Sequence, residues 1–335
     1  MYTGVSNLAS SLQMARANMQ TKLALNSAGQ EVASGRKSDV LEAAGGDYSP
    51  LFALERSLAQ FDLRAGTIRD ASAKAAATQL NMANIQETLA GYGVELLAAT
   101  DLQSQPQAFG IANSARGAMD RMVSALNGQY AGQSLFAGAG VDSAAVVDAG
   151  TLYNDISALT LAAPDSVSVI AAVDDYFFNP AGGYMTGGFT GAALNAPGAE
   201  IADGEIVNYS LRGDDLAIRN ALRNVALAAV AGNGDHGGSN LDGMNILREA
   251  GLGAVQTNDG LIELRQGLGF VEQQIDSASA RNTATASTFE INRNAILAAD
   301  PYEAATRFQA LEGQMEAIYL MSSRLSGMRL QNYLR

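Results

Sequence analysis

His236 is the single histidine of the chain, and it lies in the segment GNGDHGGSNLDG between Asp235 and Ser239. A serine, a histidine and an aspartate together could form the triad of a nucleophilic hydrolase. Such a triad needs rigid elements that hold the three side chains within hydrogen-bonding distance, and a run of glycine and asparagine does not supply them. The segment also has the Asn, Asp and Gly content of a calcium loop, but it lacks the D-x-[DN]-x-[DN]-G spacing and the closing glutamate. We therefore interpret it as a surface loop.

The other patterns that could carry chemistry are equally incomplete. The segments GAGVDS and GLGAVQ each lack the third glycine of a dinucleotide-binding fingerprint and are typical of turns. The acidic pairs Asp174–Asp175 and Asp214–Asp215 are adjacent in the sequence, so in an extended strand their side chains would point to opposite faces and into solvent. The chain has no cysteine, which excludes disulfides and thiol chemistry. We predict that the protein is not an enzyme and has no catalytic residues, no cofactor and no metal site.

Charge and hydropathy narrow the classes of partner. The formal net charge of the 335-residue chain is −13, which disfavours nucleic acid and anionic membrane surfaces, because both are bound through lysine and arginine. No stretch approaches the roughly 18 apolar residues of a membrane span. The first twenty residues lack the basic cluster and continuous apolar core of a cleaved signal peptide. We expect a soluble chain that binds neither nucleic acid nor membrane.

Two long regions have helical periodicity. The first begins at Ser49 and Pro50, which favour a helix start, and a seven-residue repeat follows in Leu54, Phe61, Ile68, Ala75, Met82, Leu89 and Leu96. The second steps by three and four through Leu261, Leu264, Leu268, Val271, Ile275 and Ala278. A repeat kept this long predicts a helix that presents one narrow seam to a partner helix. We assign residues 50–135 and 213–297 to a helical rod domain of long antiparallel helices.

Between these regions the composition changes. From Arg121 to Arg212 there is no other lysine or arginine, and most of the acidic excess of the chain lies in this stretch. It is rich in glycine and proline, and the short segments SVSVIAAV and GEIVNYSLR are β-prone and alternate with turn signals. We predict that residues 136–212 form an acidic, outward-facing β insert in an otherwise mainly α chain.

Both ends of the chain carry a narrow apolar stripe at helical spacing. The stripe consists of Val5, Leu8, Leu12, Ala15 and Met19 at the amino-terminal end, and of Phe308, Leu311, Met315, Ile318 and Leu325 at the carboxy-terminal end. Asp300 and Pro301 mark the start of the last helix, with Glu303 placed for a capping box. We expect residues 1–49 and 298–335 to pair as a coiled coil. An isolated helix pair is marginally stable, so we interpret the stripes as an assembly seam that neighbouring chains complete.

Four segments resemble the flagellin superfamily, and within it the hook-associated protein 3 family. EVASGRKSD resembles the Ser-Gly-basic segment that follows the first helix in these proteins, and GQYAGQSLFAGAGVDSAAV resembles their Tyr-Leu-Phe-Ala-Gly segment. QGLGFVEQQIDSAS and the closing LSGMRLQNYLR resemble their carboxy-terminal helices. The likeness covers roughly the first 140 and the last 80 residues, and not the insert.

The resemblance implies a flagellin-like fold and a structural role. Members of this family are exported to the extracellular flagellum through the type III channel without a cleaved signal peptide, and their terminal helices form the inner wall of a tube. The implied partners are copies of the same chain, neighbouring junction and filament proteins, and an export chaperone on the carboxy-terminal helix. The resemblance favours a subunit that joins hook to filament. A filament-forming flagellin and a secreted adhesin that binds a ligand through its insert are the alternatives.

Overall fold

The computed structural model describes the backbone of residues 3–333 and the side chains of residue 9 and residues 11–324. The chain is mainly α-helical, as predicted, and it divides into two compact units. Unit 1 comprises Met1–Asp62 and Thr283–Arg335, and unit 2 comprises Leu63–Asn282. Two long helices, α3 (Ser49–Asp101) and α9 (Asn240–Leu297), contribute residues to both units.

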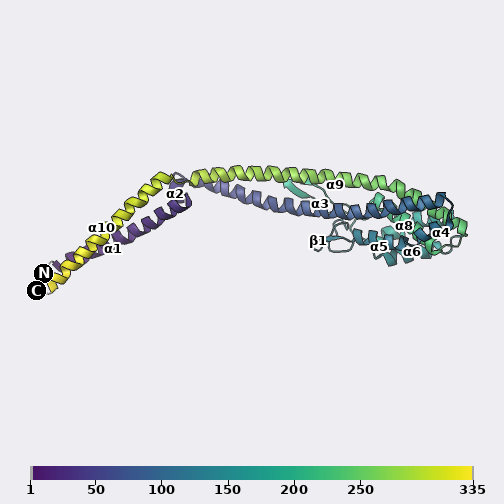
Figure 1. The fold of residues 1–335 in the computed structure, drawn as a ribbon, viewed down its shortest axis with the longest axis horizontal. Helices are drawn as coiled ribbons and strands as arrows, with labels where there is room; N and C mark the ends of the chain where they lie inside the picture. Colours follow the sequence, from purple (N-terminus) through teal and green to yellow (C-terminus); the bar gives the residue numbers. More distant parts are fainter. Residues whose placement is uncertain (1–2, 334–335) are drawn as a thin grey trace. The chain divides into compact units, whose positions relative to one another are not determined.

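Unit 1 is built from paired helices. Helix α1 (Thr3–Ser34) packs along α10 (Pro301–Tyr333), and Figure 1 shows the two side by side. A short helix, α2 (Val40–Ala43), leads from α1 to the first turns of α3. Those turns pack on the last turns of α9, where the rings of Phe61 and Phe289 meet edge to face with their centroids 5.3 Å apart. The start of α3 is as predicted to within one residue, because Asp47 accepts a hydrogen bond from the Ser49 N–H at the first turn.

Unit 2 is a helical layer laid against the other parts of α3 and α9. Along the chain its elements are α4 (Gln105–Ala112), α5 (Ala115–Leu126), β1 (Gln129–Tyr130), β2 (Gln133–Ser134), α6 (Ala149–Thr160), α7 (Ser166–Phe178), the π-helical turn η1 (Tyr184–Gly188), β3 (Ala199–Ala202), β4 (Glu205–Val207) and α8 (Leu216–Asn233). The strands form two antiparallel hairpins, β1–β2 and β3–β4. Helix α8 packs against α4, α5, α6 and α7, so it lies at the centre of the layer (Figure 1).

The core of unit 2 follows the predicted seven-residue repeat. Ile68, Ala75, Met82, Leu89 and Leu96 are all buried. Ile68 and Ala75 pack with Leu268 and Ile275 of α9 and with the β3–β4 hairpin, and the seam from Met82 onward joins a larger cluster that contains most of α8. Gln86 of α3 donates a hydrogen bond of 3.1 Å to Asn258 of α9, and Asp101 of α3 forms an ion pair of 3.1 Å with Arg248 of α9. These pairs fix the antiparallel register of the rod.

The insert differs from the expected β structure. Of the segments predicted as strands, GEIVNYSLR does contain β4, but SVSVIAAV lies in helix α7. Asp165 caps this helix by accepting the Ser168 N–H at 2.8 Å, and Val169, Val173 and Phe177 are buried at helical spacing. A short apolar run is consistent with strand or helix, and contact with α8 decides the outcome here. In the described part of residues 136–212, the strands are confined to β3 and β4.

Candidate functional site

The carboxy-terminal part of the predicted seam lies on one side of α10. Met315 is buried, with 8% of its surface exposed, and Phe308, Leu311 and Ile318 are half-buried. The Phe308 ring lies against α1 at Gly29, where an added Cβ would be 3.3 Å from its Cε2 atom. This half of the stripe therefore faces α1. Leu325 lies outside the residues whose side chains the structure describes.

The amino-terminal part of the predicted seam faces away from α10. Leu12 is 53% exposed, Met19 is 67% exposed and Ala15 is exposed as well. The less exposed face of α1 instead carries Ser11, Met14, Asn18, Thr21, Leu25 and Ala28, of which Thr21 and Ala28 are buried and the others are half-buried. Small and polar side chains interrupt the apolar ones on this face, so it does not stand out as an apolar stripe, and sequence periodicity therefore missed it. Val5 and Leu8 lie outside the described side chains.

A stripe on α1 thus remains without cover in the single chain. Leu12, Met19 and Leu23 are all more than half exposed. Their spacing of seven and four residues places them within about 40° of one another on a helix of 3.6 residues per turn. We call these three residues the α1 stripe. On α10, the consecutive residues Tyr319, Leu320 and Met321 are also more than half exposed. The α1 stripe gathers three large apolar side chains on one face, which is typical of an interaction surface.

Glu31 links α1, the following turn and α10. Its carboxylate is buried, with Oε1 accepting the Ser38 N–H at 2.9 Å and the Ser38 hydroxyl at 2.7 Å. Its other oxygen, Oε2, lies 3.4 Å from Nη1 of Arg307. The two Ser38 hydrogen bonds, with Arg307 and Lys37 in support, hold the pKa of Glu31 below its ordinary value. The Ser-Gly-basic segment therefore has a structural purpose, because its last serine caps the buried carboxylate.

The connection between α1 and α2 is tied to the end of α9. Gly35 ends α1 with a φ of 67°, a conformation that favours glycine. The Lys37 N–H donates to the Leu297 carbonyl at 2.8 Å, and the Ala299 N–H donates to the Gly35 carbonyl at 3.0 Å. Arg36 donates to the Asn294 side chain at 3.2 Å. These bonds hold the two chain segments together at the point where both terminal helices begin or end.

The predicted start of the last helix is confirmed. Asp300 Oδ1 accepts hydrogen bonds from the backbone N–H groups of Tyr302 at 2.8 Å and Glu303 at 3.1 Å, and Pro301 is the first helical residue. The Glu303 side chain lies 3.4 Å from Arg307, one turn further along the helix. Arg307 therefore bridges Glu303 and Glu31, and connects the start of α10 to the end of α1.

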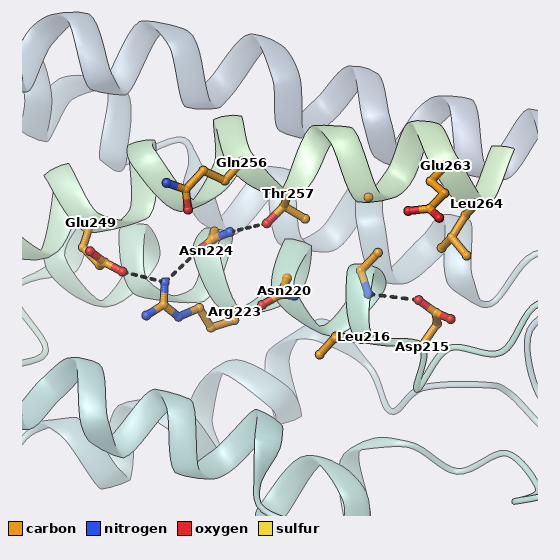
Figure 2. A pocket seen from close by; sticks show the side chains of 13 residues that line it. Asp215, Leu216, Asn220, Arg223, Asn224, Glu249, Gln256, Thr257, Glu263 and Leu264 are labelled. Carbon is orange, nitrogen blue, oxygen red and sulfur yellow. Dashed lines mark hydrogen bonds and ion pairs between the residues drawn. The ribbon is translucent and has the colours of Figure 1, made fainter. Parts of the chain in front are cut away.

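A second candidate site is a pocket of about 490 Å³ between α8 and α9 in unit 2 (Figure 2). Its wall contains Arg223, which is buried and makes a bidentate ion pair with Asp174 at 2.7 and 3.3 Å. The guanidinium also donates to Glu249 at 3.2 Å and to Asn224 at 2.9 Å. Asn224 in turn donates to Thr257 at 3.0 Å. This network fixes the wall of the pocket, and sequence reasoning missed it because its members lie far apart along the chain.

Two of the three residues first considered for catalysis form hydrogen bonds with residues outside the proposed triad. Asp235 accepts the hydroxyl of Tyr153, and Ser239 donates its hydroxyl to Asp242 at 2.6 Å. The His236 Nδ1 atom is buried without a hydrogen-bond partner in the described part of the chain. The Ser239 bonds lower the pKa of Asp242 to about 2, because they stabilise its charged form. Among the described residues, no hydrogen bond joins any two of the three candidate triad residues.

The adjacent acidic pairs also have structural partners. Asp174 binds Arg223, and Asp175 accepts a hydrogen bond of 2.8 Å from Asn179. Asp214 pairs with Arg212, and Asp215 caps α8 by accepting the Ala217 N–H at 2.9 Å. The interpretation of these acids as purely solvated is therefore wrong, because three of them bind cations or cap a helix. Among the described residues, no group of three or more metal-ligating side chains is placed to hold an ion. None of the helices in that same part combines the length and apolar character that a membrane crossing needs.

Comparison with known protein families points to the flagellins. Residues 241–334 match the family model of the bacterial flagellin C-terminal helical region, a range that covers nearly all of α9 and α10. The predicted resemblance to the flagellin superfamily is thereby confirmed, and with it the mainly α, flagellin-like fold.

A structure described as that of a flagellar hook-associated protein from Vibrio parahaemolyticus is 11% identical, covers 71% of this chain and 95% of its own, and has a TM-score of 0.40. No protein of curated function matches the chain.

Proposed function

We propose that the protein is a structural subunit of the bacterial flagellum that joins hook to filament by helical stacking of its terminal helices. The single observation that carries the proposal is the exposed α1 stripe, which lies on a helix whose other side is already packed on α10. The flagellin match over α9 and α10 supports the coarser part of the proposal, a structural subunit of the flagellum. No chemistry is required of such a subunit.

Thin packing in the terminal pair supports an assembly role. The described residues form two clusters of buried apolar side chains, and neither contains a residue of α1 or α10. Burying a leucine or methionine side chain contributes about 1.5–3 kcal/mol, and the interior of this pair offers few of them. The pair would gain most of its stability when a neighbouring copy covers the α1 stripe. A head-to-tail contact of this kind, repeated without closing, generates a helical tube.

The proposal also assigns a role to each domain of the chain. Residues 1–49 and 298–335 would form the assembly domain, residues 50–135 and 213–297 the rod, and residues 136–212 the outward-facing acidic part. The proposed partners are copies of this chain, the adjoining junction and filament proteins, and an export chaperone on α10. The proposed location is the extracellular flagellum, reached without cleavage of a signal peptide.

A deletion strain separates this role from that of a filament flagellin. If the chain joins hook to filament, cells without it carry bare hooks, and electron microscopy shows no filaments while flagellin accumulates in the medium. If the chain is itself the filament subunit, flagellin is absent from the cells and from the medium. The second outcome would refute the junction role and leave the flagellar class intact. Normal filaments in the deletion strain would contradict both.

A further inference from the structure

We propose that the pocket between α8 and α9 binds an arginine- or lysine-bearing segment of a partner protein. The inference concerns unit 2 and goes beyond the assembly role proposed for the terminal helices. Three observations support this proposal: the charge of the pocket, the free polar groups on the wall of the pocket, and the length of the pocket along α9.

The pocket has more negative than positive charge. Asp215, Glu249 and Glu263 line it together with a single cation, Arg223. That cation is already matched, because it binds Glu249 and also Asp174 behind the wall. Asp215 and Glu263 lie at one end of the pocket and Glu249 at the other (Figure 2). An anionic ligand would face uncompensated carboxylates, so the pocket selects a cation.

The wall also presents polar groups that the fold does not use. Asn220, Gln256 and Glu263 line the pocket and make no hydrogen bond or ion pair with other described residues. Two free amides and one free carboxylate can accept and donate the hydrogen bonds of a guanidinium and of a peptide backbone. In contrast, the buried groups on the same wall, Arg223 and Asn224, are fully engaged and hold it rigid. A rigid wall lowers the entropy cost of binding, because its own side chains are already ordered.

The shape of the pocket favours a polypeptide over a small ion. Its α9 side runs from Glu249 to Leu264, about 22 Å of helix at 1.5 Å per residue. An extended peptide of about seven residues spans this distance. Two glycines of α9 make the groove possible: at Gly253 an added Cβ would collide with the Asn224 amide, and at Gly260 it would be 3.3 Å from the Cβ of Ala217. Small residues at these two positions let α8 and α9 approach while the polar wall stays open.

The test is a binding measurement on the full chain in dilute solution. The probe is a fluorescein-labelled peptide of seven residues in which arginine alternates with glycine, and its matched control has citrulline, which is neutral and of the same shape, in place of arginine. We expect saturable fluorescence anisotropy with the arginine peptide, at least about tenfold weaker binding of the citrulline peptide, and a loss of affinity as salt rises. Absence of saturable binding up to millimolar concentration, or equal binding of the two peptides, would overturn the proposal.

Two substitutions that each remove one negative charge, Glu263→Gln in the pocket and Glu272→Gln outside it, show where the peptide binds. Glu263→Gln removes the free carboxylate of the pocket and is expected to weaken binding about threefold, and Glu263→Lys more than about tenfold. Glu272→Gln is the control, since Glu272 lies nine residues further on α9 and therefore on its opposite face. If Glu272→Gln weakened binding as much as Glu263→Gln, attraction to the acidic chain as a whole would explain the result and the pocket would be excluded. The measurement involves no assembly, so its failure would leave the structural role of the terminal helices untouched.

Discussion

Arg307 of α10 lies 3.4 Å from the buried carboxylate of Glu31 at the end of α1. This ion pair, together with the two Ser38 hydrogen bonds to the same carboxylate, ties the last helix of the chain to the first one 276 residues away. The pair is the polar anchor of an interface that is otherwise thin. The terminal helices thus have a fixed register at the turn, while the apolar α1 stripe further along is exposed in the single chain.

Removal of the Glu31 carboxylate is predicted to loosen the terminal pair without unfolding unit 2. Glu31→Ala leaves the Ser38 N–H without its acceptor and the turn without its anchor, a loss of about 1–3 kcal/mol for a buried hydrogen-bonding group. Hydrogen exchange should accelerate in residues 25–38 and 300–308 and stay unchanged in α8. Glu303→Gln, at an exposed position that also pairs with Arg307, should change stability by no more than about 0.5 kcal/mol. Equal effects of the two variants would contradict an anchoring role for Glu31.

The stability of the terminal pair should depend on pH through the same carboxylate. The folded-state pKa of Glu31 is lowered, chiefly by its Ser38 hydrogen bonds. Its contribution is therefore fully present above the ordinary pKa of about 4.5 and is lost as pH falls through the lowered value. Helix content followed by circular dichroism from pH 7 to pH 2 should fall in this window in the wild type. In Glu31→Gln the corresponding step should be absent, and a step of the same size there would show that other carboxylates cause it.

Substitutions on the two halves of the predicted seam should have different effects. Leu12→Asp changes an exposed side chain, so the isolated chain should melt within about 0.5 kcal/mol of the wild type while incorporation into the flagellum is lost. Leu311→Asp places a charge in the α1–α10 contact and should weaken the isolated terminal pair as well as incorporation. Thermal melts and electron microscopy of complemented deletion strains measure the two properties. Incorporation of Leu12→Asp at wild-type level would remove the α1 stripe from the assembly surface.

The close approach of α3 and α9 predicts a sharp contrast between two glycines. At Gly93 an added Cβ would be 2.6 Å from the Cβ of Ala254, whereas at Gly91 no atom lies within 4 Å. Gly93→Leu should therefore destabilise unit 2 by about 1–3 kcal/mol or more through overpacking. Gly91→Leu should be neutral or stabilising by up to about 1 kcal/mol, since leucine favours a helix more than glycine does. Denaturant unfolding of both variants tests the prediction, and equal midpoints would show that the two helices are further apart.

The sequence was sufficient to predict the elements that repeat over many turns. The heptad through Ile68, Met82 and Leu96 is buried as expected, and the Asp300–Pro301 start of α10 is confirmed. Both signals are local and redundant, because each turn of the seam repeats the same pattern and the cap needs only neighbouring residues. The resemblance to flagellins depends on short segments, of which two lie in α9 and α10, and it was predictable because each segment is local.

The features that depend on distant contacts were not predictable in this way. SVSVIAAV has a high β propensity, yet its packing on α8 makes it a helix. The inner face of α1 mixes Met14 and Leu25 with Thr21, Ala28 and Gly29, so its apolar signal is weak, and it is recognised only when the Phe308 ring is placed against Gly29. The pairing of Arg223 with Asp174 joins residues 49 positions apart. In each case the partner, and not the local pattern, determines the structure.

The most direct test of the proposed assembly role is hydrogen–deuterium exchange of the purified chain in dilute solution and of the same chain within isolated hook–filament junctions. We predict that the amides of α1 and α10 exchange rapidly in the isolated chain, more slowly as its concentration rises, and very slowly in the junction, while those of α8 are protected in every sample. Terminal helices that are already fully protected in dilute solution, with no change on concentration or assembly, would contradict the role of the α1 stripe as a surface that neighbouring subunits cover.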